Sequence, residues 1–137
     1  METAKKYDHY SARIANKTGE GARVLKALGD AGVNFIAVWG YVKSSRIGIL
    51  EFIPEDGKVF AKAAKAAGLE LGPKVAAFVV NGQDRPGAVA EALGSLGAAG
   101  INVVAAQAVC GGEGRYGAAL YVAPADARKA AKVLGAQ

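Results

Sequence analysis

Two kinds of hydrophobic spacing follow one another along the chain, and their order predicts the same set of elements twice. In the first half, the spacing changes from strand to helix, strand, strand and helix over residues 10–15, 21–31, 34–41, 46–53 and 58–67. In the second half, the same order occurs over residues 75–80, 88–99, 102–109, 116–122 and 125–134. The order β-α-β-β-α, with a final strand left open, predicts two ferredoxin-like α+β domains in tandem, each an antiparallel sheet with helices on one face.

The two halves also carry the same residue types at matching positions. Five residues of the first half return 68 positions later: Gly19, Leu25, Leu28, Gly32 and Asn34 become Gly87, Leu93, Leu96, Gly100 and Asn102. This period is longer than the roughly 20 to 50 residues of solenoid repeats, so each copy is expected to be a small domain. We predict an N-terminal extension at residues 1–8, a first domain at 9–72 and a second at 73–137.

The third strand of each copy contains a glycine that suggests a small change of spacing. Matching Gly48 with Gly117 requires an offset of 69, which predicts one extra residue in the second hairpin turn. Hairpin turns tolerate such insertions because they lie on the surface.

Composition excludes several functional classes. The start of the chain lacks the apolar segment of a signal peptide, and no apolar run reaches the ~18 residues of a transmembrane helix, so we expect a cytoplasmic protein without a membrane partner. Cys110 is the single cysteine and His9 the single histidine, near an N-terminus that we expect to be mobile. No Ser/His/Asp, Cys/His or paired-carboxylate set is evident, so we expect no enzyme activity, no metal and no cofactor.

The net charge of +5 raises the alternative of nucleic-acid binding. The RNA-recognition motif has the same element order, and Phe78 and Tyr116 lie in segments that resemble its first and third strands. However, Ala118 stands where a base-stacking aromatic is needed, and the basic residues are spread along the chain. RNA binding is therefore kept as an alternative, and nucleic acid is not the expected partner.

The loop before the second-copy helix, Asp84-Arg85-Pro86-Gly87, and the later Gly100-Ile101-Asn102 resemble the pattern of the ACT domains. These are amino-acid-binding regulatory modules with a βαββαβ fold. The resemblance implies ligand contacts in the loop after the first strand and at the start of the second. In this chain those positions are Asn16, Lys17, Thr18, Gly19 and Asn34 in the first copy, and Asp84, Arg85, Gly87 and Asn102 in the second.

Physical chemistry supports part of this assignment and leaves an alternative open. Backbone N–H groups at the start of a helix favour a carboxylate, and an Asn amide both donates and accepts hydrogen bonds. Asn34 and Asn102 could equally follow helix C-caps, with Gly32 and Gly100 in the left-handed conformation. The first-copy loop also departs from the family pattern, since Thr18 replaces the proline. Trp39 and Tyr41 have no aromatic equivalents in the second copy, and packing is their expected role.

The resemblance implies a ligand sensor that acts on a separate protein. We expect a non-catalytic, homodimeric regulator that binds a small-molecule effector, an amino acid, and controls a partner enzyme of amino-acid metabolism. A dimerisation scaffold that has lost its ligand is a further alternative.

Overall fold

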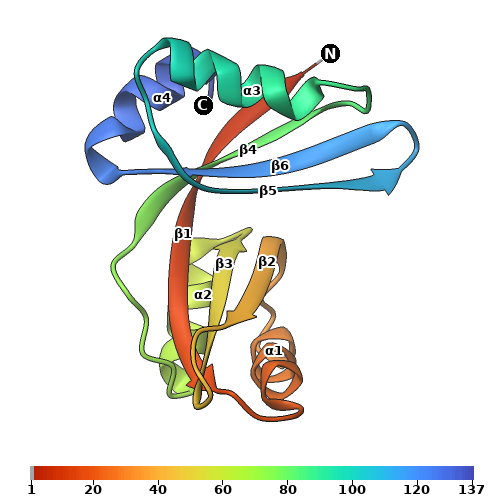
Figure 1. The fold of residues 1–137 in the computed structure, drawn as a ribbon. Helices are drawn as coiled ribbons and strands as arrows, with labels where there is room; N and C mark the ends of the chain where they lie inside the picture. Colours follow the sequence, from red (N-terminus) through yellow and green to blue (C-terminus); the bar gives the residue numbers. More distant parts are fainter. Residues whose placement is uncertain (1) are drawn as a thin grey trace. The chain divides into compact units, whose positions relative to one another are not determined.

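The computed structural model describes residues 2–137, which form an α+β fold with six antiparallel strands and four α-helices (Figure 1). The expected α+β class and antiparallel pairing are confirmed. Internal contacts divide the chain into two compact units. We call Asp8–Val75 the continuous unit, and we call Ala76–Gln137 together with the segment ending at Tyr7 the split unit.

The continuous unit follows the predicted order of elements. After the second part of β1 (Thr3–Ala15) come α1 (Glu20–Asp30), β2 (Phe35–Val42), β3 (Ile47–Pro54) and α2 (Gly57–Ala66). The strand order is β2-β3-β1, and Leu71 bridges Ala12. Asp56 begins α2 by accepting hydrogen bonds from the backbone N–H groups of Lys58 and Val59. The sheet and the two helices enclose an aromatic core whose largest fully buried residues are Phe52, Phe60 and Leu28.

The split unit has the same local order built from different residues. It contains all but the first residue of β4 (Val75–Gln83), followed by α3 (Ala88–Ala98), β5 (Val103–Gly112), β6 (Arg115–Val122), a 3-10 turn (Pro124–Asp126) and α4 (Ala127–Leu134). The strand order is β5-β6-β4-β1, in which β1 contributes its first part. Phe78, Leu96 and Leu120 are fully buried in a core that is rich in alanine.

The start of β1 corrects the prediction for the N-terminus. We expected an extension at residues 1–8 and a strand from residue 10, but β1 begins at Thr3. The backbone N–H of Lys6 donates to the carbonyl of Gln137 at 3.1 Å, and the Tyr116 hydroxyl donates to Glu2 at 3.0 Å. This segment has few apolar positions, so its pairing depends on partners about 75 to 130 positions away that a local pattern cannot reveal.

The strand register corrects the predicted insertion in the second hairpin. Ser11 pairs with Glu51 and Tyr41 with Ile49, while Val79 pairs with Ala119 and Val109 with Gly117. Every one of these equivalent positions differs by 68, so the second turn has no extra residue. Gly117 matches Ile49, not Gly48, and the glycine match was coincidental.

The buried aromatics weaken the RNA-binding alternative. Phe78 and Tyr116 belong to the core that packs against α3 and α4. Their side chains therefore point away from the sheet surface on which bases would stack.

Candidate functional site

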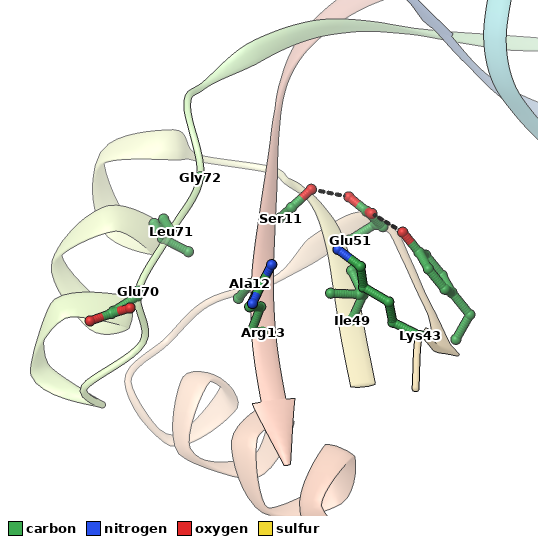
Figure 2. Close-up of a pocket in the computed structure, with 10 residues that line it drawn as sticks. Ser11, Ala12, Arg13, Lys43, Ile49, Glu51, Glu70, Leu71 and Gly72 are labelled. Atoms are coloured by element: carbon green, nitrogen blue, oxygen red, sulfur yellow. Dashed lines mark hydrogen bonds between the residues drawn. The ribbon is translucent and has the colours of Figure 1, made fainter. Parts of the chain in front are cut away.

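The strongest candidate site lies on the face of the continuous unit opposite its helices. Side chains alternate along a strand, so Ala12, Leu50 and Phe52 face α1 and α2 while Ser11 and Glu51 face the other way. A cleft of about 400 Å³ opens there (Figure 2). We call it the sheet-face cleft, and it is lined by Ser11, Ala12, Arg13, Tyr41, Lys43, Ile49, Glu51, Glu70, Leu71 and Gly72.

Glu51 is a buried carboxylate at the wall of this cleft and is only 7% exposed. Nε2 of His9 lies 2.7 Å from Oε1 of Glu51, and the Ser11 hydroxyl donates to the same oxygen. The Tyr41 hydroxyl donates to Oε2 at 3.1 Å. Three side chains from β1 and β2, the two strands that flank β3, thus hold one carboxylate in place, and the contact between Ser11 and Glu51 is visible in Figure 2.

The hydrogen bonds to Glu51 also control its charge. Burial alone raises the pKa of the Glu51 carboxyl, but hydrogen bonds from His9 and Ser11 outweigh burial and leave the pKa below its ordinary value. Burial, together with the nearby Glu51 charge, raises the pKa of Tyr41. At neutral pH the carboxylate is therefore ionised and the tyrosine hydroxyl keeps the proton that it donates.

Two cationic side chains line the same cleft. Arg13 comes from β1 and Lys43 from the residue after β2. Within residues 2–137, no carboxylate lies within 4.0 Å of the charged nitrogens of either residue. Figure 2 shows Lys43 extending toward Glu51, whereas the carboxylate of Glu70 points away. The cleft therefore combines two cations open to an anion with one fixed, buried carboxylate.

A second, smaller cleft of about 290 Å³ lies nearby and includes two of the predicted residues, Asn16 and Lys17. The Asn16 amide donates to the carbonyls of Ser44 and Ser45, each at 3.3 Å. These contacts tie the loop after β1 to the tip of the β2-β3 hairpin. The Asn16 amide nitrogen thus stabilises the loop by hydrogen bonding to the backbone.

The other predicted residues of the continuous unit do not gather at one place. Thr18 is exposed, and Gly19 precedes α1 with φ of 84°, which favours glycine. Asn34 follows the opposite end of α1, about 16 Å away for an 11-residue helix, and its amide donates to Glu55 at 2.9 Å. Within this unit, Asn34 and the Asn16–Gly19 loop cannot contact one small ligand.

The split unit separates its predicted residues in the same way. Asp84 accepts a hydrogen bond from the Cys110 thiol at 3.2 Å, Arg85 pairs with Glu91, and Gly87 precedes α3 with φ of 84°. Asn102 lies exposed beyond the other end of α3. These four residues therefore do not form a single pocket within their unit.

The glycines before the two asparagines adopt the geometry of the capping alternative. Gly32 has φ of 86° and Gly100 has φ of 77°. Both values are left-handed, as expected for glycines that end a helix.

Ser11, Arg13, Lys43 and Glu51 line the sheet-face cleft but are not among the residues predicted from the sequence. One signal was present, because Glu51 is the only charged residue in the apolar strand Ile47–Pro54. A charged side chain inside a buried strand is rare unless it has partners. The partners themselves come from β1 and β2, and only the register brings them together.

Residues 2–137 also lack two features that would indicate other functions. No group of three or more His, Cys, Asp or Glu side chains in that range is placed to hold a metal ion. No helix in the described chain combines the length and the apolar character needed to cross a membrane.

Comparison with known proteins finds similarity at the level of structure. No family model matches the sequence, and no curated protein matches it. A protein from Bacteroides thetaiotaomicron superposes with a TM-score of 0.81 at 23% identity, over 96% of this chain and 88% of that one. The ligand-free regulatory subunit of aspartate kinase from Thermus thermophilus gives 0.66 at 16% identity, over 98% and 94%.

A third solved structure shows how much of a larger enzyme this fold represents. Aspartate kinase from Clostridium acetobutylicum, described as an allosteric enzyme, gives a TM-score of 0.58 at 16% identity, over 98% of this chain but 33% of that one. At these identities the comparisons establish the fold alone, which this chain shares with the regulatory subunit of the Thermus enzyme and with part of the Clostridium enzyme.

Proposed function

We propose that this chain is a non-catalytic regulator of the tandem ACT type that binds an amino acid and controls a separate enzyme of amino-acid metabolism. The observation that carries the proposal is the extent of the structural match. Nearly the whole chain superposes on nearly the whole regulatory subunit of the Thermus enzyme. In the Clostridium enzyme the same fold occupies about a third of the chain. In the proposed role, this chain would act in trans on an enzyme carried by a separate chain.

The repeated register supports the tandem part of the proposal. Both units place a helix between the first and second strand, and equivalent strand pairs differ by 68 positions in both hairpins. Duplication of one β-α-β-β-α module accounts for this agreement.

The chemistry of the sheet-face cleft supports the ligand part. Small-molecule sites are typically concave, about 300 to 1,000 Å³, and carry a few polar groups that fix orientation. The cleft has this size and offers Arg13 and Lys43 beside Glu51. An amino acid carries the opposite pair of charges, a carboxylate and an ammonium.

A thermal-shift screen against the twenty amino acids tests the proposal, with hits confirmed by calorimetry. An amino acid present at 100 times its dissociation constant stabilises the folded state by about 2.7 kcal/mol, which is a readily measured rise in melting temperature. We expect one or a few selective hits. If none of the twenty shifts the melting temperature of folded protein, the chain is not an amino-acid sensor.

The regulatory and oligomeric parts need their own measurements. We expect the protein to be cytoplasmic. We also expect a homodimer, and light scattering coupled to size-exclusion chromatography at micromolar concentration tests this oligomeric state. We also expect the amino acid that binds to change the amount of partner enzyme retained by the immobilised protein. A monomer, or retention that does not respond to ligand, would contradict these parts and leave ligand binding standing.

A further inference from the structure

The sheet-face cleft differs from every position that the sequence pattern assigned to ligand contact. None of the residues in the Asn16–Gly19 loop, the Asp84–Gly87 loop or the two asparagines lines it. The loop residues that line a cavity, Asn16 and Lys17, border the smaller cleft instead. Most residues that line the larger cleft come from β1, β2 and β3, and strands hold side chains more rigidly than loops do.

The cost of burying Glu51 is the first argument that this cleft has a use. Removing an ionised carboxylate from water costs several kcal/mol unless partners compensate. Three donors, His9, Ser11 and Tyr41, compensate here. A carboxylate has about four acceptor positions, so one remains on a group that forms part of the cleft wall.

The position of the two cations is the second argument. Arg13 reaches the cleft from β1 and Lys43 from the residue after β2, and neither has an ionic partner within 4.0 Å among residues 2–137. Two like charges that converge on a concave surface repel each other, and an anion between them removes the repulsion. The Arg guanidinium has a planar fork that matches a carboxylate.

We propose that the sheet-face cleft is the effector site, in which Arg13 and Lys43 bind the carboxylate of an amino acid and Glu51 accepts a hydrogen bond from its ammonium group. This inference rests on the proposed function and adds the location and the charge pattern of the site. Tyr41 contributes its ring to the wall and its hydroxyl to the position of Glu51.

The split unit lacks the site. Its equivalents of Arg13, Lys43 and Glu51 are Asn81, Gly111 and Ala119. Neither a cation pair nor a carboxylate is available at these positions. The stoichiometry is therefore one amino acid per chain.

Trp39 provides a local probe of the cleft. It is the only tryptophan of the chain, its ring centroid lies 5.3 Å from that of Tyr41, and it pairs across strands with Glu51. An amino acid that enters the cleft should change its fluorescence. Binding in the Asp84–Gly87 loop of the split unit has no tryptophan within that unit to report it.

The experiment titrates the full chain with the twenty amino acids, followed by Trp39 fluorescence and calorimetry. Arg13→Gln and Lys43→Gln each remove one cation while keeping a long polar side chain. Arg128→Gln and Lys129→Gln on α4 are the matched controls, since both residues are exposed and belong to the split unit. Each loss of a charge-assisted contact should weaken binding about 10- to 100-fold, with the controls unchanged.

Ligand analogues separate the roles of the two charges. For the amino acid that binds best, the matching amine lacks the carboxylate and the matching keto acid lacks the ammonium. Arg13→Gln should lower the affinity for the keto acid as much as it lowers the affinity for the amino acid. It should leave the affinity for the amine unchanged. Glu51→Gln should weaken the amino acid more than the keto acid.

Two results would overturn the inference in different ways. If an amino acid binds and both cation variants retain wild-type affinity while Arg85→Gln or Asn102→Ala loses it, the site lies in the split unit and the proposed function survives. If none of the twenty binds to folded wild-type protein by either readout, the proposed function fails together with this site.

Discussion

The two units share a backbone plan but differ in chemistry on the face opposite their helices. In the continuous unit this face carries Ser11, Tyr41 and Glu51, which are linked by hydrogen bonds. In the split unit the equivalent positions hold Val79, Val109 and Ala119. The sheet needs only alternation and register to form, so either set of side chains is compatible with it. The repeat thus defines the scaffold, while a few outward positions on one copy provide a polar surface.

The cores differ as well, and the largest predicted effect concerns them. Phe52→Ala in the continuous unit should lower the free energy of unfolding by about 3 to 5 kcal/mol, and Leu120→Ala at the equivalent position should cost less. The Phe52 ring centroid lies 5.0 Å from that of Phe60 and 5.4 Å from that of Phe35, contacts that alanine cannot make. Urea unfolding followed by Trp39 fluorescence and circular dichroism measures both variants. An equal or larger loss for Leu120→Ala would contradict the comparison.

The next largest effect concerns Glu51 itself. Glu51→Ala removes a buried carboxylate and leaves its three donors without their acceptor, which should cost about 3 kcal/mol, whereas exposed Glu70→Ala should change stability by less than about 0.5 kcal/mol. Replacing the donors together with the acceptor should recover most of the loss, because no polar group is then left unpaired. The variant for this combines His9→Ala, Ser11→Val, Tyr41→Val and Glu51→Ala, which copies the split unit. Failure to recover would mean that Glu51 acts through something other than these bonds.

Acid should also lower the stability of the folded protein through Glu51, by less than the substitution Glu51→Ala does. The folded-state pKa of Glu51 lies below its ordinary value of 4.5, so the stabilisation is complete well above 4.5 and is lost as the pH falls through the lower folded-state pKa. The loss should appear in urea midpoints measured between about pH 6 and 2. Glu51→Gln should flatten that part of the profile. An unchanged profile in the variant would show that other carboxylates dominate.

The glycines before α1 and α3 test whether both units need a left-handed backbone conformation at the start of their first helix. Gly19→Ala and Gly87→Ala should each cost about 1 to 2 kcal/mol, because both residues have φ of 84°. Gly29→Ala and Gly94→Ala, inside the same two helices, should stabilise the protein by up to about 1 kcal/mol. Thermal unfolding of the four variants gives the comparison. Opposite signs at Gly19 and Gly87 would show that the loops are not equivalent.

The smallest effect separates the two asparagines. Asn34→Ala removes the exposed hydrogen bond to Glu55 and should cost about 0.5 kcal/mol, while Asn102→Ala should cost close to zero. Calorimetry with the bound amino acid should give unchanged affinity for both. If only one of the two variants loses affinity, the asparagine replaced in it contacts the ligand.

Sequence patterns predicted the helices and most strands because these depend on local periodicity. The strongly spaced apolar residues Val24 and Leu28 are buried in α1 as expected. The start of β1 escaped prediction because its pairing partner is β4, far along the chain. Glu51 could be noticed as unusual from the sequence, but its contacts with His9 and Ser11 depend on the register of β1 against β3, which residue types alone do not reveal.

β1 contributes residues to both units, and this has a consequence for the order of folding during synthesis. The residues of the continuous unit emerge from the ribosome as one uninterrupted block and can form their core early. The split unit must join residues 3–7 to residues up to Gln137, and the bond from Lys6 to Gln137 can form only when translation of this segment is complete. Contacts of such long sequence separation form slowly. The continuous unit, whose sheet face is the more polar, can therefore fold first. The split unit is completed last.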